Sequence, residues 1–219
     1  MKEVGENEAK KQIGYEPLPI LGREKVLELI ETKKKRLSTV FQNFEPVFDA
    51  AGLYQTPDAG WQVNFTHTLE WNMAAMTLRP GDHEVFEVHG GICEEWYSRG
   101  GAWDNGKKGQ LGWPLSDELS CDGEAKISLF ERGTIFWEPA RPTERVVRTW
   151  EESVDWFNVE AAKGLAWAQA RLGDCFMNGC GLPRDYGKAF KWFNAAKGNG
   201  LSEIEPSLQD AARHFILSL

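Results

Sequence analysis

A three-residue motif that occurs twice near the end of the chain constrains the fold more than any other feature. Trp156-Phe157-Asn158 returns as Trp192-Phe193-Asn194, and Gly164-Leu165 returns as Gly200-Leu201, both at a spacing of 36 residues. Repeats of this length are typical of arrays of paired helices that bury aromatic and small residues between them. We therefore expect helices over residues 148–219, with residues 203–219 as a capping helix.

The residues around this motif have a recognisable order. A small-residue stretch ends in Leu172-Gly173, a Gly179-Cys180-Gly181 link follows, and a Lys-Ala-x-x-Trp-aromatic segment ends at Phe193. This order resembles the Sel1-like repeat, an αα-hairpin relative of the tetratricopeptide repeat, over about residues 155–200. The resemblance implies a surface that holds a protein partner.

The middle of the chain follows a different period. From Trp61 to Met73 apolar residues mostly alternate with polar ones, which predicts strands with one buried face. A turn at 79–82 and a further strand over 83–89 follow. Glycines and tryptophans are frequent up to residue 140, so we predict that region 61–140 is β-rich.

Within this region, residues 84–141 resemble the LGFP repeat. The pattern consists of a Gly-x-Ile-x-x-x-Trp segment, a Gly-Gly pair, a Leu-Gly-x-Pro turn with Ser-Asp-Glu, and a Phe-x-x-Gly-x-Ile-aromatic-Trp strand. It is carried by Gly90, Ile92, Trp96, Gly100, Gly101, Leu111, Gly112, Pro114, Ser116, Asp117, Glu118, Phe130, Gly133, Ile135, Phe136 and Trp137. The resemblance implies a glycan-binding or cell-envelope-binding module.

The start of the chain adds a polar arm over residues 1–21 and a helix over 23–44, whose apolar residues recur at three- and four-residue spacing. We therefore predict an α+β protein with three parts: residues 1–50 form the arm and helix, 51–147 the LGFP-like β module, and 148–219 the helical repeat packed against it.

The net negative charge of the chain lies in its middle segment. Residues 51–140 carry six basic and fourteen acidic side chains, whereas the segments on either side are each neutral. Such a field repels nucleic acid and favours a basic protein partner. The first candidates for partner binding are the acidic residues of this segment and two tryptophans expected on loops: Glu94, Glu95, Trp103, Asp104, Trp113, Asp117, Glu118, Asp122 and Glu124.

Nothing in the sequence converges on catalysis, so we expect no enzyme, no cofactor and no metal. If residues 83–89 form a strand, His83, Glu87 and His89 share one face, a geometry that would suit a metal but also a solvated face. Cys93 and His89 could form a thiol–imidazole pair, but no third orienting group is visible. The four cysteines are expected to be free thiols.

Three functions stay open. The first is a non-enzymatic protein-binding protein, such as a bacterial immunity protein that neutralises a basic toxin domain through its acidic surface. The alternative is a glycan or cell-envelope binder that uses Trp103 and Trp113, and the last is an enzyme. We expect no membrane span and no export signal, which favours a cytoplasmic location; the oligomeric state is not encoded in any pattern.

Overall fold

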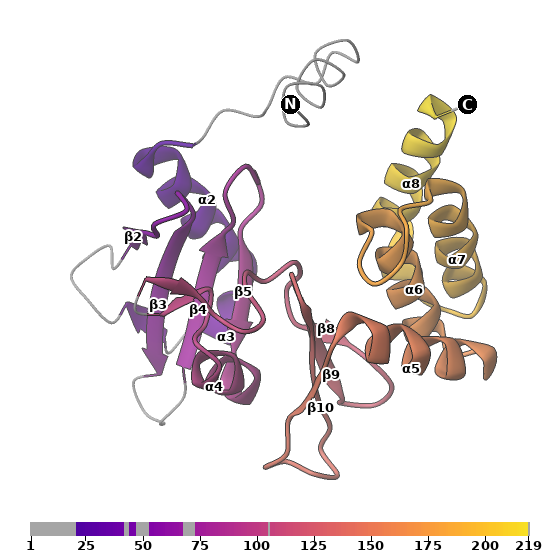
Figure 1. The fold of residues 1–219 in the computed structure, drawn as a ribbon, viewed down its shortest axis with the longest axis horizontal. Coiled ribbons are helices and arrows are strands. Elements are labelled where there is room, and N and C mark those ends of the chain that lie inside the picture. Colours follow the sequence, from indigo (N-terminus) through magenta and orange to yellow (C-terminus); the bar gives the residue numbers. More distant parts are fainter. Residues whose placement is uncertain (1–20, 42–43, 47–52, 68–72, 105, 219) are drawn as a thin grey trace. The chain divides into compact units, whose positions relative to one another are not determined.

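The computed structural model describes residues 21–41, 44–46, 53–67, 73–104 and 106–218 (Figure 1). The predicted arm over 1–21 and the apolar residues Leu69 and Trp71 lie almost wholly outside these ranges. The chain divides into two compact units, one made of residues 1–71 and 75–86 and the other of 72–74 and 87–219. Each unit is described by itself below.

In the first unit, the predicted amphipathic helix is present but shorter than expected. Helix α2 spans Arg23–Arg36, a short helix α3 spans Ser38–Phe41, and Phe44 already belongs to strand β1 (Phe44–Pro46). Val26 and Ile30 of α2 are buried. The chain leaves the helix before Pro46 because proline cannot continue a helix and restricts the residue that precedes it.

In the sheet of the first unit, β3 (Trp61–His67) pairs with β1 and β2 (Leu53–Gln55) in antiparallel orientation. It pairs with β1 on one side along its second half and with β2 along its first half. The sheet order is β1-β3-β4-β5, where β4 is Met73–Leu78 and β5 is Phe86–His89. Phe41 stands edge-on to Phe65 at 5.3 Å between ring centroids, which joins α3 to the sheet.

The second unit begins with a helix inside the region predicted to be β-rich. Residues Gly90–Ser98 form α4, although the sequence pattern had placed them among strands. Ile92, Cys93 and Trp96 are buried, and this spacing matches one face of a helix rather than the alternation of a strand. Residues 90–98, which include Glu94 and Glu95, are therefore a helical exception within the region predicted to be β-rich.

A four-stranded antiparallel sheet of order β11-β10-β9-β8 follows the Leu-Gly-x-Pro turn (Figure 1). Its strands are Leu119–Ser120 (β8), Lys126–Phe130 (β9), Gly133–Trp137 (β10) and Val146–Arg148 (β11). A separate two-stranded ribbon joins Trp103–Asp104 (β6) to Lys107–Lys108 (β7). Gly112 has a φ of +73°, which glycine adopts without steric cost. The turn then runs beside β9, where Leu115 N donates to Leu129 O at 2.8 Å.

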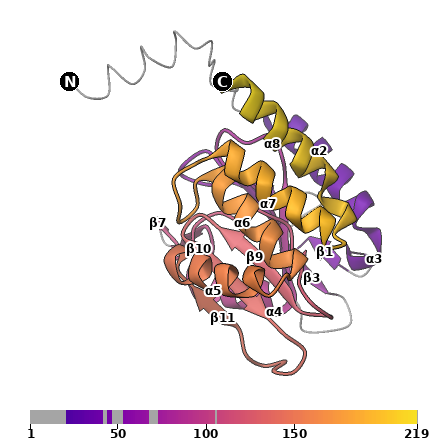
Figure 2. The ribbon, with the colours of Figure 1, turned by 90° about the vertical axis from the view of Figure 1, so that its right-hand side faces the viewer.

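Helices form the rest of the second unit, as the repeated motif predicted (Figure 2). A capping box at Thr149 and Glu152 starts the first of them. The elements are Trp150–Ala162 (α5), Ala166–Asn178 (α6), Tyr186–Gly198 (α7), a 3-10 turn at Ser202–Ile204 (η1) and Glu205–Leu217 (α8). The final helix thus begins at Glu205 and not at residue 203.

Two hydrophobic clusters hold these helices. The first joins Ile127 and Leu129 of β9 to Phe157 of α5 and to Trp167 and Leu172 of α6, so the sheet and the helices share one core. The second cluster lies between α6, α7 and α8 and includes Phe193, Leu208 and Ala211. The α+β class is confirmed, and the helical segment packs on the β sheet as expected.

Candidate functional site

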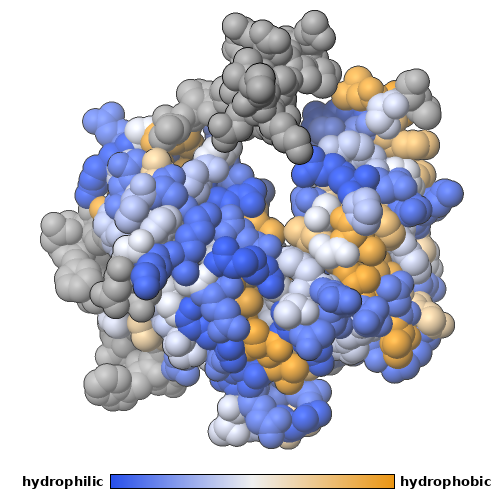
Figure 3. Space-filling model, in the orientation of Figure 1, coloured by the Kyte–Doolittle hydropathy of each residue, from blue (hydrophilic) through white to orange (hydrophobic). Residues whose placement is uncertain are grey.

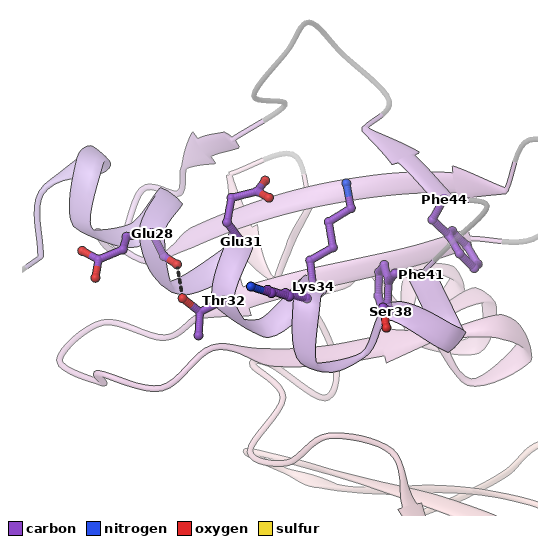
Figure 4. Close-up of a pocket in the computed structure, with 8 residues that line it drawn as sticks. Glu28, Glu31, Thr32, Lys34, Ser38, Phe41 and Phe44 are labelled. Atoms are coloured by element: carbon purple, nitrogen blue, oxygen red, sulfur yellow. Dashed lines mark hydrogen bonds between the residues drawn. The ribbon is translucent and has the colours of Figure 1, made fainter.

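An open groove on the first unit is lined by side chains of α2, α3 and β1 (Figure 4). Its rim carries Glu28, Glu31 and Lys34, and Phe41 and Phe44 lie at its base with their rings 5.3 Å apart. Acidic and basic residues alternate on this rim, and both phenylalanines are almost fully buried. The groove therefore offers neither a net charge nor an accessible aromatic face to a ligand.

In the second unit, a carboxylate–imidazole cluster joins β5 to the loop that follows Pro114. The Nδ1 atom of His89 lies 2.7 Å from Oε2 of Glu87, and its Nε2 atom lies 3.4 Å from Oε1 of Glu118. The other carboxylate oxygen of Glu87 accepts a hydrogen bond from Glu118 N at 3.2 Å. Asp117 completes the connection because its Oδ1 accepts from Glu87 N at 3.1 Å.

Burial and charge act against each other within this cluster. Burial alone would lower the pKa of His89, but the hydrogen bond that His89 donates to Glu87 and the charges of Glu87 and Glu118 outweigh it, so the pKa is raised. Burial also raises the pKa of Glu118, against the attraction of His89. Both nitrogens of the imidazole face carboxylates of the protein, so the cluster has the character of a structural connection.

The two catalytic alternatives built on this region do not assemble. His83 lies on an exposed loop before β5, so it does not share a face with Glu87 and His89. Among the described residues, no group of three or more His, Cys, Asp or Glu side chains could hold a metal ion. Cys93 is fully buried, and burial raises the pKa of its thiol well above the ordinary range, which keeps it in the unreactive protonated form.

A cleft of about 460 Å³ lies within the second unit, between the sheet and the first two helices of the repeat segment. Side chains of β10, β11, α5 and α6 and of the loops at 121–125 and 138–141 form it. The lining residues are Cys121, Asp122, Ala125, Phe136, Glu138, Arg141, Val146, Arg148, Trp156, Glu160, Leu165 and Trp167. Its size suits a small molecule or one or two sugar rings.

Aromatic rings and one guanidinium dominate the wall of this cleft. Trp156 stands edge-on to Phe136 at 4.9 Å and lies 5.1 Å from Trp167, measured between ring centroids. The guanidinium of Arg148 lies over the ring of Trp156 at 4.2 Å from its centroid. The cleft therefore combines apolar ring surface with a fixed donor group, the mixture by which ligand sites achieve both affinity and orientation.

The charged side chains that line the cleft differ in whether they form an ion pair within the protein. Glu138 pairs with Arg141 at 2.9 Å and Glu160 pairs with Lys163 at 2.7 Å. Burial lowers the pKa of Arg148, although the charges of Glu152 and Glu138 act in the opposite direction. Burial raises the pKa of Cys121 to about 12, so this thiol stays protonated and gives the cleft no nucleophile at neutral pH.

The two tryptophans predicted to contact a partner differ in burial. Trp113 is fully buried, which contradicts its predicted exposure on a loop: the turn places its ring in the core, and Trp113 O accepts from Glu131 N at 3.0 Å. Trp103 is half-buried on the short ribbon of β6 and β7. Neither tryptophan lines the cleft.

The acidic residues predicted to contact a partner also differ in exposure. Glu94, Asp122 and Glu124 are exposed. Glu95 pairs with Arg99 at 2.7 Å. Asp117 and Glu118 belong to the cluster around Glu87, as described above, and are only partly exposed because their side chains bond within the protein. The side chain of Asp104 lies outside the described part of the structure.

The residues that make the cleft were missed by sequence reasoning. Trp156 and Phe136 had been assigned to packing, and Arg148 and Trp167 had not been considered. These four residues come from four different elements, so no spacing in the sequence marks them as a set. The one signal in the sequence is the composition of the junction between β11 and α5. Arg148 ends the strand, and Trp150 and Trp156 lie in the helix that follows.

Comparison with known proteins identifies part of this unit. The family described as the LGFP repeat matches residues 111–152, which include the Leu-Gly-x-Pro turn, all four strands of the sheet and the start of α5. No curated protein matches the chain. The match supports the LGFP resemblance, over a shorter range and later start than residues 84–141. The LGFP repeat is a module associated with the cell envelope, and the Sel1-like resemblance of residues 155–200 stays a prediction.

The described surface and helices add one further observation. On the face drawn in Figure 3, apolar side chains form small patches separated by hydrophilic ones, including one over the helical part. Within the described ranges, no helix is long and apolar enough to cross a bilayer.

Proposed function

We propose that this chain is a non-catalytic binding protein of the cell envelope, and that its ligand is a glycan bound in the cleft of the second unit. The observation that carries the proposal is the origin of the cleft walls. Phe136, Glu138, Arg141 and Arg148 belong to the matched LGFP repeat, and Trp156 and Trp167 come from the helices that pack on it. The helices, which we propose form a Sel1-like hairpin, thus complete a site that the repeat begins.

The chemistry of the walls suits a sugar. Aromatic rings pack against the apolar faces of sugar rings, and planar carboxylate and guanidinium groups bind their hydroxyls. The neutral thiol of Cys121 and the internally bonded His89 supply no general base or nucleophile to this cleft. Two of the three carboxylates that line the cleft, Glu138 and Glu160, are held in ion pairs, and binding without turnover is the activity we propose.

Co-sedimentation of the full chain with envelope polysaccharide that has been freed of protein tests the proposal. The wild type should sediment with the polysaccharide, and Trp156→Leu should lose most of this binding because it removes a ring of the cleft wall. Trp103→Leu is the matched control, since this half-buried tryptophan of the same unit lies outside the cleft. Equal sedimentation of the two variants would exclude the cleft as the site.

A second candidate is a cytoplasmic protein-binding role, such as that of an immunity protein that captures a basic toxin domain. The observation that favours it is the exposure of Glu94, Asp122 and Glu124 in the most acidic segment of the chain. Electrostatic capture of a basic partner is weakened by salt. Under this candidate, a stoichiometric protein partner should be released by salt, and reversing these three charges should abolish its capture.

A further inference from the structure

The geometry of the cleft points to a more specific ligand: a saccharide that carries a carboxylate, held by Arg148 and by the indole N–H of Trp167. This inference rests on the proposed glycan-binding function and names the chemical class of the glycan. It is carried by two donor groups of the cleft that the protein itself leaves without an acceptor.

The first donor is the indole of Trp167. Its side chain is only 7% exposed, and its Nε1 atom has no hydrogen-bond partner among the described residues. The second donor is Nη1 of Arg148, which is buried and also lacks a partner within the described ranges. Buried donors in native proteins are nearly always satisfied, because an unsatisfied one forfeits its hydration. Nε1 of Trp61 and Nε1 of Trp103 also lack a partner in the described part of the chain, but Trp167 and Arg148 line one cleft, and the acceptor of these two donors is therefore assigned to the ligand.

The two donors are linked by one aromatic ring. Arg148 stacks on Trp156 at 4.2 Å from the ring centroid, and Trp156 lies 5.1 Å from Trp167. The N–H groups of a guanidinium lie in its plane, so stacking on a ring leaves them free to donate beside that ring. The arrangement fixes a cation next to the ring wall on which a sugar would pack.

The charge balance selects a carboxylate over a neutral hydroxyl. The carboxylates of Glu138 and Glu160 are paired with Arg141 and Lys163. Among the described residues Arg148 forms no such ion pair, and burial disfavours its charge more than Glu152 and Glu138 favour it, so an incoming anion would supply further compensation. A carboxylate also accepts two parallel hydrogen bonds from a guanidinium, which a hydroxyl cannot do.

The test is the binding of the full chain to immobilised oligogalacturonates, to their methyl esters and to neutral galactose oligomers. Methyl esterification removes the charge and leaves the sugar unchanged. The wild type should bind the acid about tenfold or more tightly than the ester, the size expected for a charge-assisted hydrogen bond. Arg148→Gln should bring this ratio close to one.

Two further variants separate the role of these donors from folding and from general charge. Trp167→Phe keeps an aromatic ring and removes only the N–H, so it should weaken binding of the acid by about 3- to 10-fold. Arg213→Gln removes an exposed arginine of the same unit that pairs with Asp210 and lies outside the cleft, and it should leave the acid-to-ester ratio within about twofold.

The outcomes are distinguishable. Equal binding of acid, ester and neutral oligomers by the wild type would overturn this inference and leave the glycan-binding proposal standing. Binding of none of the three would overturn both. Loss of the acid preference in Arg213→Gln as strongly as in Arg148→Gln would assign the preference to overall charge and contradict the role given to Arg148.

Discussion

Tryptophan residues of the second unit serve two different purposes, and their N–H groups distinguish them. Trp96 is fully buried and donates its Nε1–H to Gly112 O at 2.9 Å, which holds α4 against the Leu-Gly-x-Pro turn. Trp150 likewise donates to Glu131 O at 3.0 Å. Trp167 has no such acceptor among the described residues and lines the cleft. Trp96 and Trp150 are therefore packing residues, and the binding role of Trp167 is part of our proposal.

His89 makes the stability of the second unit depend on pH. Its pKa is raised in the folded protein, so its contribution to stability is complete below the unfolded value of 6.5 and is lost as the pH rises through the folded pKa. The raised pKa of Glu118 acts in the same direction at lower pH, because ionising a buried carboxyl costs stability once the pH passes 4.5. Both groups therefore favour the folded protein at the acidic end.

We predict that the free energy of unfolding falls as the pH rises from 6.5 through the raised pKa of His89 in the folded protein, and that His89→Gln reduces this fall. Urea denaturation at each pH measures it. His83→Gln is the control, because this histidine lies on an exposed loop, and its variant should keep the wild-type pH dependence. An unchanged slope in His89→Gln would show that the cluster does not couple protonation to folding.

At the scale of elements, the Ser-Asp-Glu segment after the turn acts as a set of backbone connections. Ser116 Oγ accepts from Leu129 N at 3.1 Å, which fixes the segment to β9. Asp117 accepts from Glu87 N and Glu118 N donates to Glu87, so the same segment is tied to β5. The Ser-Asp-Glu segment thus connects β5, the turn and β9 through hydrogen bonds within the protein.

The close approach of α6 and α7 gives a second prediction at this scale. A Cβ atom added to Gly173 would lie 2.3 Å from Cε1 of the buried Phe193, so Gly173→Ala should destabilise the chain by about 1–3 kcal/mol. Gly198→Ala is the matched control, because Gly198 lies at the end of α7 and a Cβ added there would have nothing within 4 Å; alanine at this position should be neutral or stabilising by up to about 1 kcal/mol. Thermal unfolding of both variants measures the difference; similar midpoints would contradict the packing described.

The elements differ in how far the sequence predicted them. The helices after Thr149 followed from the repeated Trp-Phe-Asn motif, because period and small residues both favour packed helices. Helix α4 was missed because its glycines and its position between strands outweighed the spacing of Ile92, Cys93 and Trp96. Burial of Trp113 was also missed, since a Gly-x-Pro turn indicates a surface loop unless the tertiary contacts of its middle residue are known. The cleft depends on contacts between distant elements, which no local pattern encodes.

At the scale of the whole molecule, the two candidate functions use different sets of side chains of the second unit, although Asp122 belongs to both. Glycan binding uses a cleft with rings and a buried cation, whereas capture of a basic protein uses the exposed carboxylates Glu94, Asp122 and Glu124. The first is associated with the cell envelope and the second with the cytoplasm. Salt separates them as well, because contacts with aromatic rings persist at high ionic strength and those between exposed charges weaken.

Tryptophan indole N–H signals offer the most direct test of the central claim, that the cleft of the second unit binds envelope glycan. The chain has ten tryptophans, and each indole N–H gives its own resonance in a ¹⁵N-labelled sample, assignable with Trp→Phe variants. On titration with soluble fragments of envelope polysaccharide, the signals of Trp156 and Trp167 should shift while those of Trp96 and Trp113 stay unchanged. No shift at Trp156 and Trp167, or equal shifts throughout, would contradict the assignment of the cleft as the glycan site.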